Sequence, residues 1–384
     1  MVTLLLCIIY ISFISLGLPD SLLGSAWPSM YNALNVPLPY AGIISMIISA
    51  GTVVSSIFCV KVLRRFGTGF VTMTSVFITA AALIGFSFSH SFIFLCLCAI
   101  PLGLGGGAVD AALNNYVALH YKARHMSWLH CFWGIGASLG PFIMSYFLIN
   151  KDSWNSGYRS IGIIQFCLFL ILIISLPLWK NDKLSEKSEK NNAPGFKKIF
   201  SIPGVKQALS VFFCYCSIEW ITGLWGASYL VTEKGFSPEI AAKWASLHFI
   251  GITFGRFISG FVTFKLSNRQ MIRMGQIIIG CGIIVIVMPF NTAPLLGLFL
   301  IGLGCAPIFP SMLHETPVNF GRENSQAIIG IQMGCAYIGS SIMPPIFGWF
   351  AHIFSFNIFP FVIGAILIVK IILVGSLYKK TSKG

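Results

Sequence analysis

Residues 157–179 of the chain are GYRSIGIIQFCLFLILIISLPLW, and residues 180–206 are KNDKLSEKSEKNNAPGFKKIFSIPGVK. The first stretch is long and apolar enough to form one membrane-spanning helix. The second is the only long polar stretch in the sequence, and its Lys, Ser, Glu and Asn content is typical of a flexible linker. Together they predict a membrane protein whose spans fall into two groups, one on each side of a polar linker.

The composition of the whole chain agrees with this interpretation. Of its 384 residues, 56% are hydrophobic and only 9% are charged, and the mean hydropathy is +0.84. A soluble domain carries about 25% charged residues, so this chain lacks the polar surface of a soluble enzyme or a nucleic-acid-binding protein. The formal net charge of +14 is therefore interpreted through membrane topology rather than as a nucleic-acid-binding surface.

The sequence gives no indication of a metal site or a cofactor. Its eleven cysteines occur singly or as Cys-X-Cys inside apolar runs, without other ligands at metal-binding spacing. We interpret them as small packing residues. No G-x-x-x-x-G-K-[ST] phosphate-binding loop occurs in the sequence, which argues against ATP as a driving force.

Apolar runs of spanning length, separated by charged or Gly/Pro/Asn-rich breaks, follow one another along the chain. Their length, without a ten-residue polar/apolar alternation, predicts helices rather than barrel strands. The first is interpreted as an uncleaved span and not a signal peptide, because it lacks a basic n-region and a cleavage site. The twelve predicted spans are residues 3–31, 39–60, 69–88, 91–119, 126–149, 157–179, 206–231, 239–264, 270–290, 293–318, 325–350 and 354–378.

Most of the 25 Lys and Arg residues fall in the even-numbered connections, in the central linker and at the C-terminus. Basic residues gather on the cytoplasmic side of membrane proteins, so we expect a multi-pass protein of the plasma (inner) membrane with cytoplasmic termini. The predicted domains are an N-terminal six-helix bundle (1–179), a cytoplasmic linker (180–205) and a C-terminal six-helix bundle (206–384). Binding of anionic lipid headgroups is a second interpretation of the linker lysines.

The second half of the chain carries weak matches to the first half at offsets near 200 residues. At an offset of 204, Gly51 and Lys61 fall on Gly255 and Lys265. At 199, residues 103–105 fall on 302–304, and at 203, residues 135–136 and 141 fall on 338–339 and 344. Because the matches keep the same order, they predict duplication of a six-helix unit.

Twelve spans in two halves, joined by a long cytoplasmic loop, resemble the major facilitator superfamily. The turn at residues 61–67, KVLRRFG, resembles the signature loop of that superfamily without its usual Asp, and residues 255–257, GRF, resemble the start of a second copy. The resemblance implies an all-α membrane protein of two pseudo-symmetric six-helix bundles. It also implies a monomer that moves a small solute across the lipid bilayer by alternating access.

Three acidic residues, Asp20, Asp110 and Glu219, fall within predicted spans. An ionised carboxylate in hydrocarbon costs about 2.5 kcal/mol or more, so each is expected to face a cavity, to pair with a base or to stay protonated. A carboxyl group that takes up and releases a proton is what a cation-coupled transporter requires. Asn114 follows Asp110 by four residues, so the two side chains share one helix face.

Two short segments resemble motifs of the fucose/glucose-permease-like symporters. They are residues 19–22, PDSL, and residues 109–114, VDAALN. The resemblance implies that Asp20 couples transport to a cation and that Asp110 takes part in coupling or sugar binding. Residues 129–134, LHCFWG, resemble a polar contact segment of that branch, with His130 where the branch has an amide. Tryptophans offer stacking faces and indole donors to a sugar. The expected substrate contacts are Asn114, His130, Trp133, Glu219, Trp220 and Trp225, with Arg256 as charge partner of Glu219 or Glu315.

Several of these residues also have a purely structural interpretation. Asp110 and Asn114 would form a hydrogen-bonded pair in helix packing, and Asp20 would cap the half-helix that follows Pro19. His130 would be a satisfied histidine of the core. Few bases fall within the spans, namely Arg256 and, near the end of the last span, Lys370, which favours a neutral or cationic solute over a sugar phosphate.

The leading hypothesis is a secondary active transporter that takes up a small polar solute, such as a sugar or polyol, together with H⁺ or Na⁺. The alternative is a proton-driven efflux antiporter for drugs or metabolites, because residues 136–141, GASLGP, resemble the core of the antiporter signature. The third class is an intramembrane enzyme or a non-transporting receptor. No enzyme activity is expected, since no H-E-x-x-H metal motif occurs in the sequence.

Overall fold

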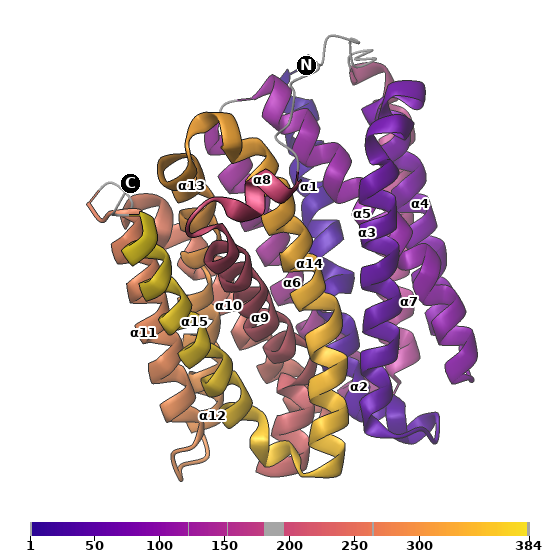
Figure 1. The fold of residues 1–384 in the computed structure, drawn as a ribbon. Helices are drawn as coiled ribbons and strands as arrows, with labels where there is room; N and C mark the ends of the chain where they lie inside the picture. Colours follow the sequence, from indigo (N-terminus) through magenta and orange to yellow (C-terminus); the bar gives the residue numbers. More distant parts are fainter. Residues whose placement is uncertain (1, 122, 152, 180–195, 263–264, 382–384) are drawn as a thin grey trace. The chain divides into compact units, whose positions relative to one another are not determined.

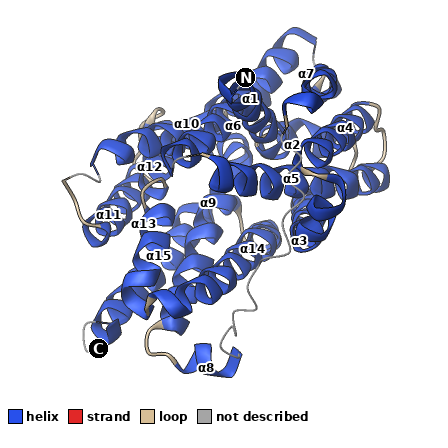
Figure 2. Cartoon of the chain, turned by 90° about the horizontal axis from the view of Figure 1, so that it is seen from above, coloured by secondary structure: helices blue, strands red, loops and turns tan. Residues whose placement is uncertain are grey.

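The computed structural model describes residues 2–121, 123–151, 153–179, 196–262 and 265–381. These residues are helical nearly throughout and contain no strand, as Figure 2 shows. The predicted linker lies outside the described residues up to residue 195. The helices, labelled in Figure 1, are α1 (Val2–Asp20), α2 (Leu22–Ala33), η1 (Leu38–Tyr40), α3 (Ala41–Phe66), α4 (Thr68–Ser87), α5 (Phe92–His120), α6 (Ala123–Lys151), α7 (Trp154–Ser175), η2 (Leu176–Leu178), α8 (Phe196–Ser201), α9 (Val205–Lys234), α10 (Pro238–Val262), α11 (Asn268–Ile286), α12 (Ala293–Cys305), α13 (Ile308–Phe320), α14 (Arg322–Ile353), η3 (Phe356–Ile358) and α15 (Phe359–Thr381).

The chain forms two compact units, which are described separately. The N-terminal unit comprises Met1–Ser188 and Gly226–Phe249, and the C-terminal unit comprises Glu189–Trp225 and Ile250–Gly384. The N-terminal unit therefore contains α1–α7 with the end of α9 and the start of α10, and the C-terminal unit contains the rest. The domain boundaries expected at residues 179 and 206 stay a prediction.

Each predicted span coincides with one long helix or with two consecutive helices. The first contains α1 and α2, the tenth contains α12 and α13, and each of the others contains one long α-helix. Within the described ranges, ten segments are long and apolar enough to cross a membrane. The two other predicted spans contain α10 and α14, helices of 25 and 32 residues. The expected all-α membrane fold is confirmed.

Helix packing repeats within the two units where the sequence repeats. In the N-terminal unit, a Cβ atom on Gly51 of α3 would lie 3.0 Å from the backbone nitrogen of Leu104 in α5. In the C-terminal unit, a Cβ atom on Gly255 of α10 would lie 2.9 Å from the carbonyl oxygen of Leu303 in α12. Gly51 and Leu104 match Gly255 and Leu303 at the offsets found in the sequence. The duplicated residues therefore make the same close helix contact, which small residues permit in membranes.

The first and fifth spans of each half show a second repeated contact. A Cβ atom on Gly136 of α6 would collide with the carbonyl oxygen of Ile14 in α1. Its match in the other half, Gly339 of α14, lies in the same way against the carbonyl oxygen of Phe213 in α9. Only glycine permits this approach of two backbones, so these positions fix how closely α1 and α6 pack.

Candidate functional site

Asp20 is the last residue of α1 and lies at the break between α1 and α2. Its side chain is exposed, and its Oδ2 accepts a hydrogen bond from the indole Nε1 of Trp133 in α6 at 2.7 Å. The residue that caps α2 is Ser21, and its side chain makes no capping hydrogen bond. The carboxylate therefore contacts a neighbouring helix, whereas the structural interpretation expected it to cap the half-helix that follows.

Pro19, one residue earlier, explains how the end of α1 is held. Because proline has no N–H, the carbonyl group of Ser15 lacks its usual helical donor. Gln165 Nε2 of α7 donates to that Ser15 oxygen at 2.6 Å, and Gln165 Oε1 accepts from Thr79 Oγ1 of α4 at 2.9 Å. All three side chains are buried. Neighbouring helices thus satisfy the backbone group that the proline frees, as is typical of membrane helices.

Close packing of α1 against α6 brings Trp133 within reach of Asp20. A Cβ atom on Gly17 of α1 would collide with the carbonyl oxygen of Trp133. On α6, a Cβ atom on Gly140 would lie 2.6 Å from the carbonyl oxygen of Leu18. Two glycines of the GASLGP segment, Gly136 and Gly140, therefore have a packing role that places the Trp133 indole beside the Asp20 carboxylate.

Asp110 and Asn114 form a hydrogen-bonded pair on α5. Asn114 Nδ2 donates to Asp110 Oδ1 at 2.9 Å and to the Asp110 carbonyl oxygen at 3.0 Å, and both side chains are partly exposed. The helix is held against α3, where Thr52 Oγ1 donates to the Gly103 carbonyl oxygen at 3.2 Å. Asp110 lies close enough to Asp20 for their charges to interact.

His130 lies on α6, three residues before Trp133. Its ring is partly buried and meets Phe13 of α1 edge-on, with 6.0 Å between ring centroids and an interplanar angle of 87°. The N-terminal unit therefore places His130, Trp133 and Asp20 along the contact between α1 and α6. The Asp110–Asn114 pair stands on the neighbouring α5.

In the C-terminal unit, Glu219 of α9 pairs with Arg256 of α10. Their Oε1 and Nη2 atoms are 3.8 Å apart, and the side chains are 12% and 18% exposed. The other acid that was considered as a partner of Arg256 is Glu315, and it faces Arg269 at 3.7 Å. The structure therefore places Glu219 opposite Arg256.

The two tryptophans expected near Glu219 differ in their surroundings. Trp220 is partly exposed. Trp225 is completely buried, and its Nε1 donates to the carbonyl oxygen of Pro344 at 2.8 Å. Phe347 and Phe356 surround its ring, at 6.3 and 5.6 Å between ring centroids. Both the donor and the faces of the Trp225 indole are thus used in packing within the C-terminal unit.

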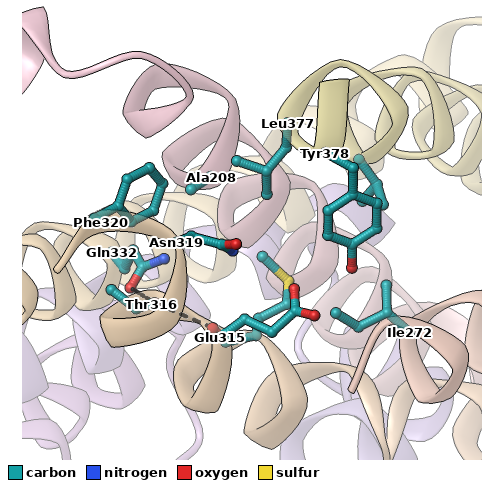
Figure 3. Close-up of a pocket in the computed structure, with 11 residues that line it drawn as sticks. Ala208, Ile272, Glu315, Thr316, Asn319, Phe320, Gln332, Leu377 and Tyr378 are labelled. Atoms are coloured by element: carbon teal, nitrogen blue, oxygen red, sulfur yellow. Dashed lines mark hydrogen bonds between the residues drawn. The ribbon is translucent and has the colours of Figure 1, made fainter. Parts of the chain in front are cut away.

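A second polar cluster of this unit lines a small pocket, which is shown in Figure 3. Thr316 Oγ1 of α13 donates to Gln332 Oε1 of α14 at 3.0 Å. The Arg269 guanidinium of α11 lies 4.5 Å from the ring centre of Tyr378 in α15, and it also pairs with Glu315. These contacts connect four helices, which gives Glu315 a role in helix packing.

The segment Gly136-Ala137-Ser138-Leu139-Gly140 also fits the G-x-S-x-G pattern of serine hydrolases. That motif requires a strand-to-helix turn that exposes the serine. Here the segment lies inside α6, and Ser138 Oγ donates to the Gly134 carbonyl oxygen at 2.8 Å. The serine is therefore engaged with its own helix and is not presented as a nucleophile.

Comparison with known proteins identifies the family of this chain. The family model of the Major Facilitator Superfamily matches residues 9–328. The chain belongs to this superfamily. Membership confirms the resemblance found in the sequence, and it indicates a multi-pass membrane transporter rather than an enzyme.

Two curated relatives are recognisable at low identity. The glucose/mannose transporter GlcP of Bacillus subtilis is 24% identical over 261 residues, which are 64% of this chain and 62% of the relative. Bypass of stop codon protein 6 of Saccharomyces cerevisiae is 22% identical over 306 residues, 69% of this chain and 60% of the relative. The chain thus matches less than two thirds of the length of these relatives.

Solved structures of transporters share the fold. One is a bacterial homologue of the human lysosomal transporter Spinster, in an inward-facing and unoccupied conformation. Its TM-score is 0.77 at 12% sequence identity, and the match covers 99% of this chain and 97% of the homologue. A mutant of the nucleoside transporter NupG also has a TM-score of 0.77, with 14% identity and coverage of 97% and 98%. At these identities the similarity shows the fold alone.

Proposed function

We propose that this superfamily member is a secondary active transporter that takes up a small polar solute, such as a sugar, together with a proton. It would work by alternating access in the plasma (inner) membrane, with both termini in the cytoplasm. The observation that carries the proposal is the hydrogen bond between Asp20 and Trp133. This contact joins a carboxyl group that can hold a proton to an indole that can bind a solute. Similarity to a protein named as a glucose/mannose transporter supports the choice of a sugar.

The chemistry of this contact suggests how proton and solute would be coupled. An indole has a single N–H donor, and in the structure Trp133 directs it at the Asp20 carboxylate. A hydrogen bond to an ionised acceptor is about twice as strong as one to a neutral acceptor. Protonation of Asp20 would therefore loosen the indole and release its N–H for a solute hydroxyl. By linkage, solute bound at Trp133 would favour the protonated carboxyl to the same extent.

The Asp110–Asn114 pair would supply further solute contacts in the N-terminal unit. The two hydrogen bonds between them use Nδ2 of Asn114. Its amide oxygen takes no part in these bonds and would accept from a solute hydroxyl. Asp110 Oδ2 takes no part in these two bonds and would accept in the same way, while His130 would contribute a ring nitrogen. In the C-terminal unit we retain Glu219 and Trp220 as proposed contacts. We leave out Trp225, because its indole is buried and hydrogen-bonded.

A neutral solute fits the charges of the described residues. Neither Asp20 nor Asp110 has a salt-bridge partner in the described part of the chain, and Arg256 faces Glu219. A sugar phosphate would require a cluster of bases that is not committed to an acid. Hydroxyl groups instead match the indole, amide and carboxyl groups that the N-terminal unit presents.

Transport by purified protein in proteoliposomes tests the proposal. Vesicles would be given radiolabelled glucose or mannose, then other hexoses, polyols and nucleosides, with the outside more acidic than the inside. Symport predicts accumulation that a protonophore abolishes. Gradient-driven extrusion of a preloaded compound would instead establish the efflux antiporter, and accumulation that needs a sodium gradient would replace the proton by Na⁺.

Asp20→Asn sharpens this test. The amide cannot gain or lose a proton, so we expect gradient-driven accumulation to fall to simple equilibration while exchange of labelled for unlabelled solute persists. Glu239→Gln, an acid at the start of α10, is the matched control and should accumulate solute like the wild type. Normal accumulation by Asp20→Asn would remove Asp20 from the coupling mechanism.

A further inference from the structure

One lysine lies in the middle of a membrane-spanning helix. Lys370 is eleven residues from the first residue of α15, Phe359, and eleven from the last, Thr381. At a rise of 1.5 Å per residue, these distances correspond to about 16 Å on either side. The sequence suggested a position near the end of the last span. The structure corrects this, because α15 begins later and ends later than the apolar run.

The Lys370 side chain is completely buried, and among the described residues its Nζ has no hydrogen-bond partner. Its observed contact is the ring of Tyr215 in α9, whose centroid is 5.5 Å from Nζ. The Tyr215 hydroxyl is also buried and, within the described ranges, has no hydrogen-bond partner. An ammonium group here would be attracted by the ring. Removing that group from water costs more than this attraction returns, so the ring alone does not compensate a charge.

Among the described residues, no acidic side chain is paired with Lys370. Glu219 lies one turn after Tyr215 on α9, but its carboxylate is paired with Arg256. The charges of Glu219 and Arg256 cancel each other. A proton on Lys370 would therefore leave one net positive charge in the interior of the C-terminal unit. Within the described ranges, the thiols of Cys214, Cys216 and Cys305 also lie within electrostatic reach of Lys370.

Helix α11 also packs against α15. Its basic residues Arg269 and Arg273 lie in the first two turns. There Arg269 lies over the ring of Tyr378, two helical turns beyond Lys370 on α15. Arg269 is paired with Glu315 of α13, so neither of these two groups offers an uncommitted charge to Lys370.

We propose that Lys370 is a proton-binding site of the C-terminal unit, unprotonated in this structure and protonated when a rearrangement brings water to its amine. The step is the reversible addition of one proton to the amine nitrogen, with no other bond made or broken. A buried position suits this ligand, because a proton needs no space of its own. The inference is independent of the transported solute and of the carboxyl groups in the N-terminal unit.

Unfolding of the purified protein in detergent as a function of pH tests this site without any solute. If the amine is unprotonated in the folded protein and protonated in the unfolded chain, unfolding takes up one extra proton. Raising the pH then disfavours unfolding. Over the range in which the folded amine is unprotonated and the unfolded one is not, which ends at about pH 10.4, the ordinary pKa of lysine, the unfolding equilibrium constant falls by up to about tenfold per pH unit from this group. Lys370→Met should lack this contribution. The matched control Lys380→Met, at the exposed end of the same helix, should retain it.

Two substitutions of Lys370, by arginine and by methionine, test its charge in the folded protein through their effect on folding. Arginine carries a permanent charge, so Lys370→Arg should fold poorly while Lys370→Met is tolerated. The reverse pattern, tolerance of arginine and damage by methionine, would show that Lys370 is charged in the folded protein. Identical pH dependence of unfolding in the wild type and in Lys370→Met would also overturn the proposal.

Discussion

In the N-terminal unit, the intramembrane acids Asp20 and Asp110 accept hydrogen bonds from neutral groups, an indole and an amide. In the C-terminal unit, Glu219 and Glu315 each face an arginine at 3.8 and 3.7 Å. The sequence alone made Asp20, Asp110 and Glu219 look alike, since all three are carboxyl groups within apolar runs. Their partners in the structure separate them.

The difference bears on which acids can change charge during a transport cycle. Removing the charge of an acid paired with a buried base leaves that base uncompensated, which is strongly unfavourable. An acid held by a neutral donor can take up a proton at the cost of weakening one hydrogen bond. We therefore infer that Asp20 and Asp110 are suited to proton exchange, and that Glu219 is suited to holding α9 and α10 together.

The largest effect on stability is expected from breaking the Glu219–Arg256 pair on one side only. Glu219→Gln leaves the Arg256 charge without its partner and should lower the free energy of unfolding by about 3 kcal/mol. The double variant Glu219→Gln with Arg256→Met removes both charges and should recover most of that loss. Neutralising Asp20 in the same way should cost only about 1 kcal/mol. Chemical denaturation in detergent measures all of these variants.

Additive losses in the double variant would contradict this account, because they would show that the two side chains stabilise the protein independently. An equal loss of stability in Glu219→Gln and Asp20→Asn would remove the distinction between paired and neutrally bonded acids.

A smaller effect is expected from separating α1 and α6. Gly17→Ala places a Cβ atom against the carbonyl oxygen of Trp133, so the helices must shift, at a cost of about 2 kcal/mol. The same shift should lengthen the Asp20–Trp133 contact and reduce accumulation in proteoliposomes. Gly334→Ala is the matched control, since a Cβ atom on Gly334 would meet nothing within 4 Å. Equal behaviour of the two alanine variants would show that the close approach does not position the site.

The smallest effect is expected from Trp133→Phe, which keeps an aromatic face and removes the indole N–H. Loss of one hydrogen bond worth about 1.4 kcal/mol corresponds to about a tenfold weaker apparent solute affinity. Proton-driven accumulation at saturating solute should be reduced, because the indole N–H links protonation of Asp20 to solute binding, but not abolished as in Asp20→Asn, because Asp20 can still take up a proton. Transport kinetics across solute concentrations separate the two outcomes, and complete loss of accumulation would assign Trp133 a role beyond that of a donor.

The fold could be predicted from the sequence because it depends on local features. Apolar run lengths identify the helices, and the scarcity of charge makes each intramembrane acid conspicuous. Glycines at matching positions such as Gly51 and Gly255 indicated the repeat, and the structure shows why, since both bring two backbones into contact.

The contacts within the site could not be predicted in the same way, because they connect residues far apart in the chain. Nothing near Trp225 distinguishes a buried indole from a solute contact, and its hydrogen bond to Pro344 spans 119 residues. The Asp20–Trp133 contact spans 113 residues. One residue that holds α1 could be recognised from the sequence alone. Gln165 is the single amide in the apolar run 157–179, and it holds the backbone that Pro19 frees.

The most direct test of the central claim is proton movement that depends on solute. Proteoliposomes containing a pH-sensitive dye would receive glucose or mannose without an imposed gradient, and entry of protons would be followed as acidification of the interior. The account predicts acidification by the wild type and by a Glu315→Gln, Arg269→Met double variant, whose charge pair in the C-terminal unit lies outside the proposed solute contacts, and none by Asp20→Asn. The opposite result would be undiminished acidification by Asp20→Asn and no acidification by the double variant. It would contradict the assignment of proton coupling to the N-terminal unit.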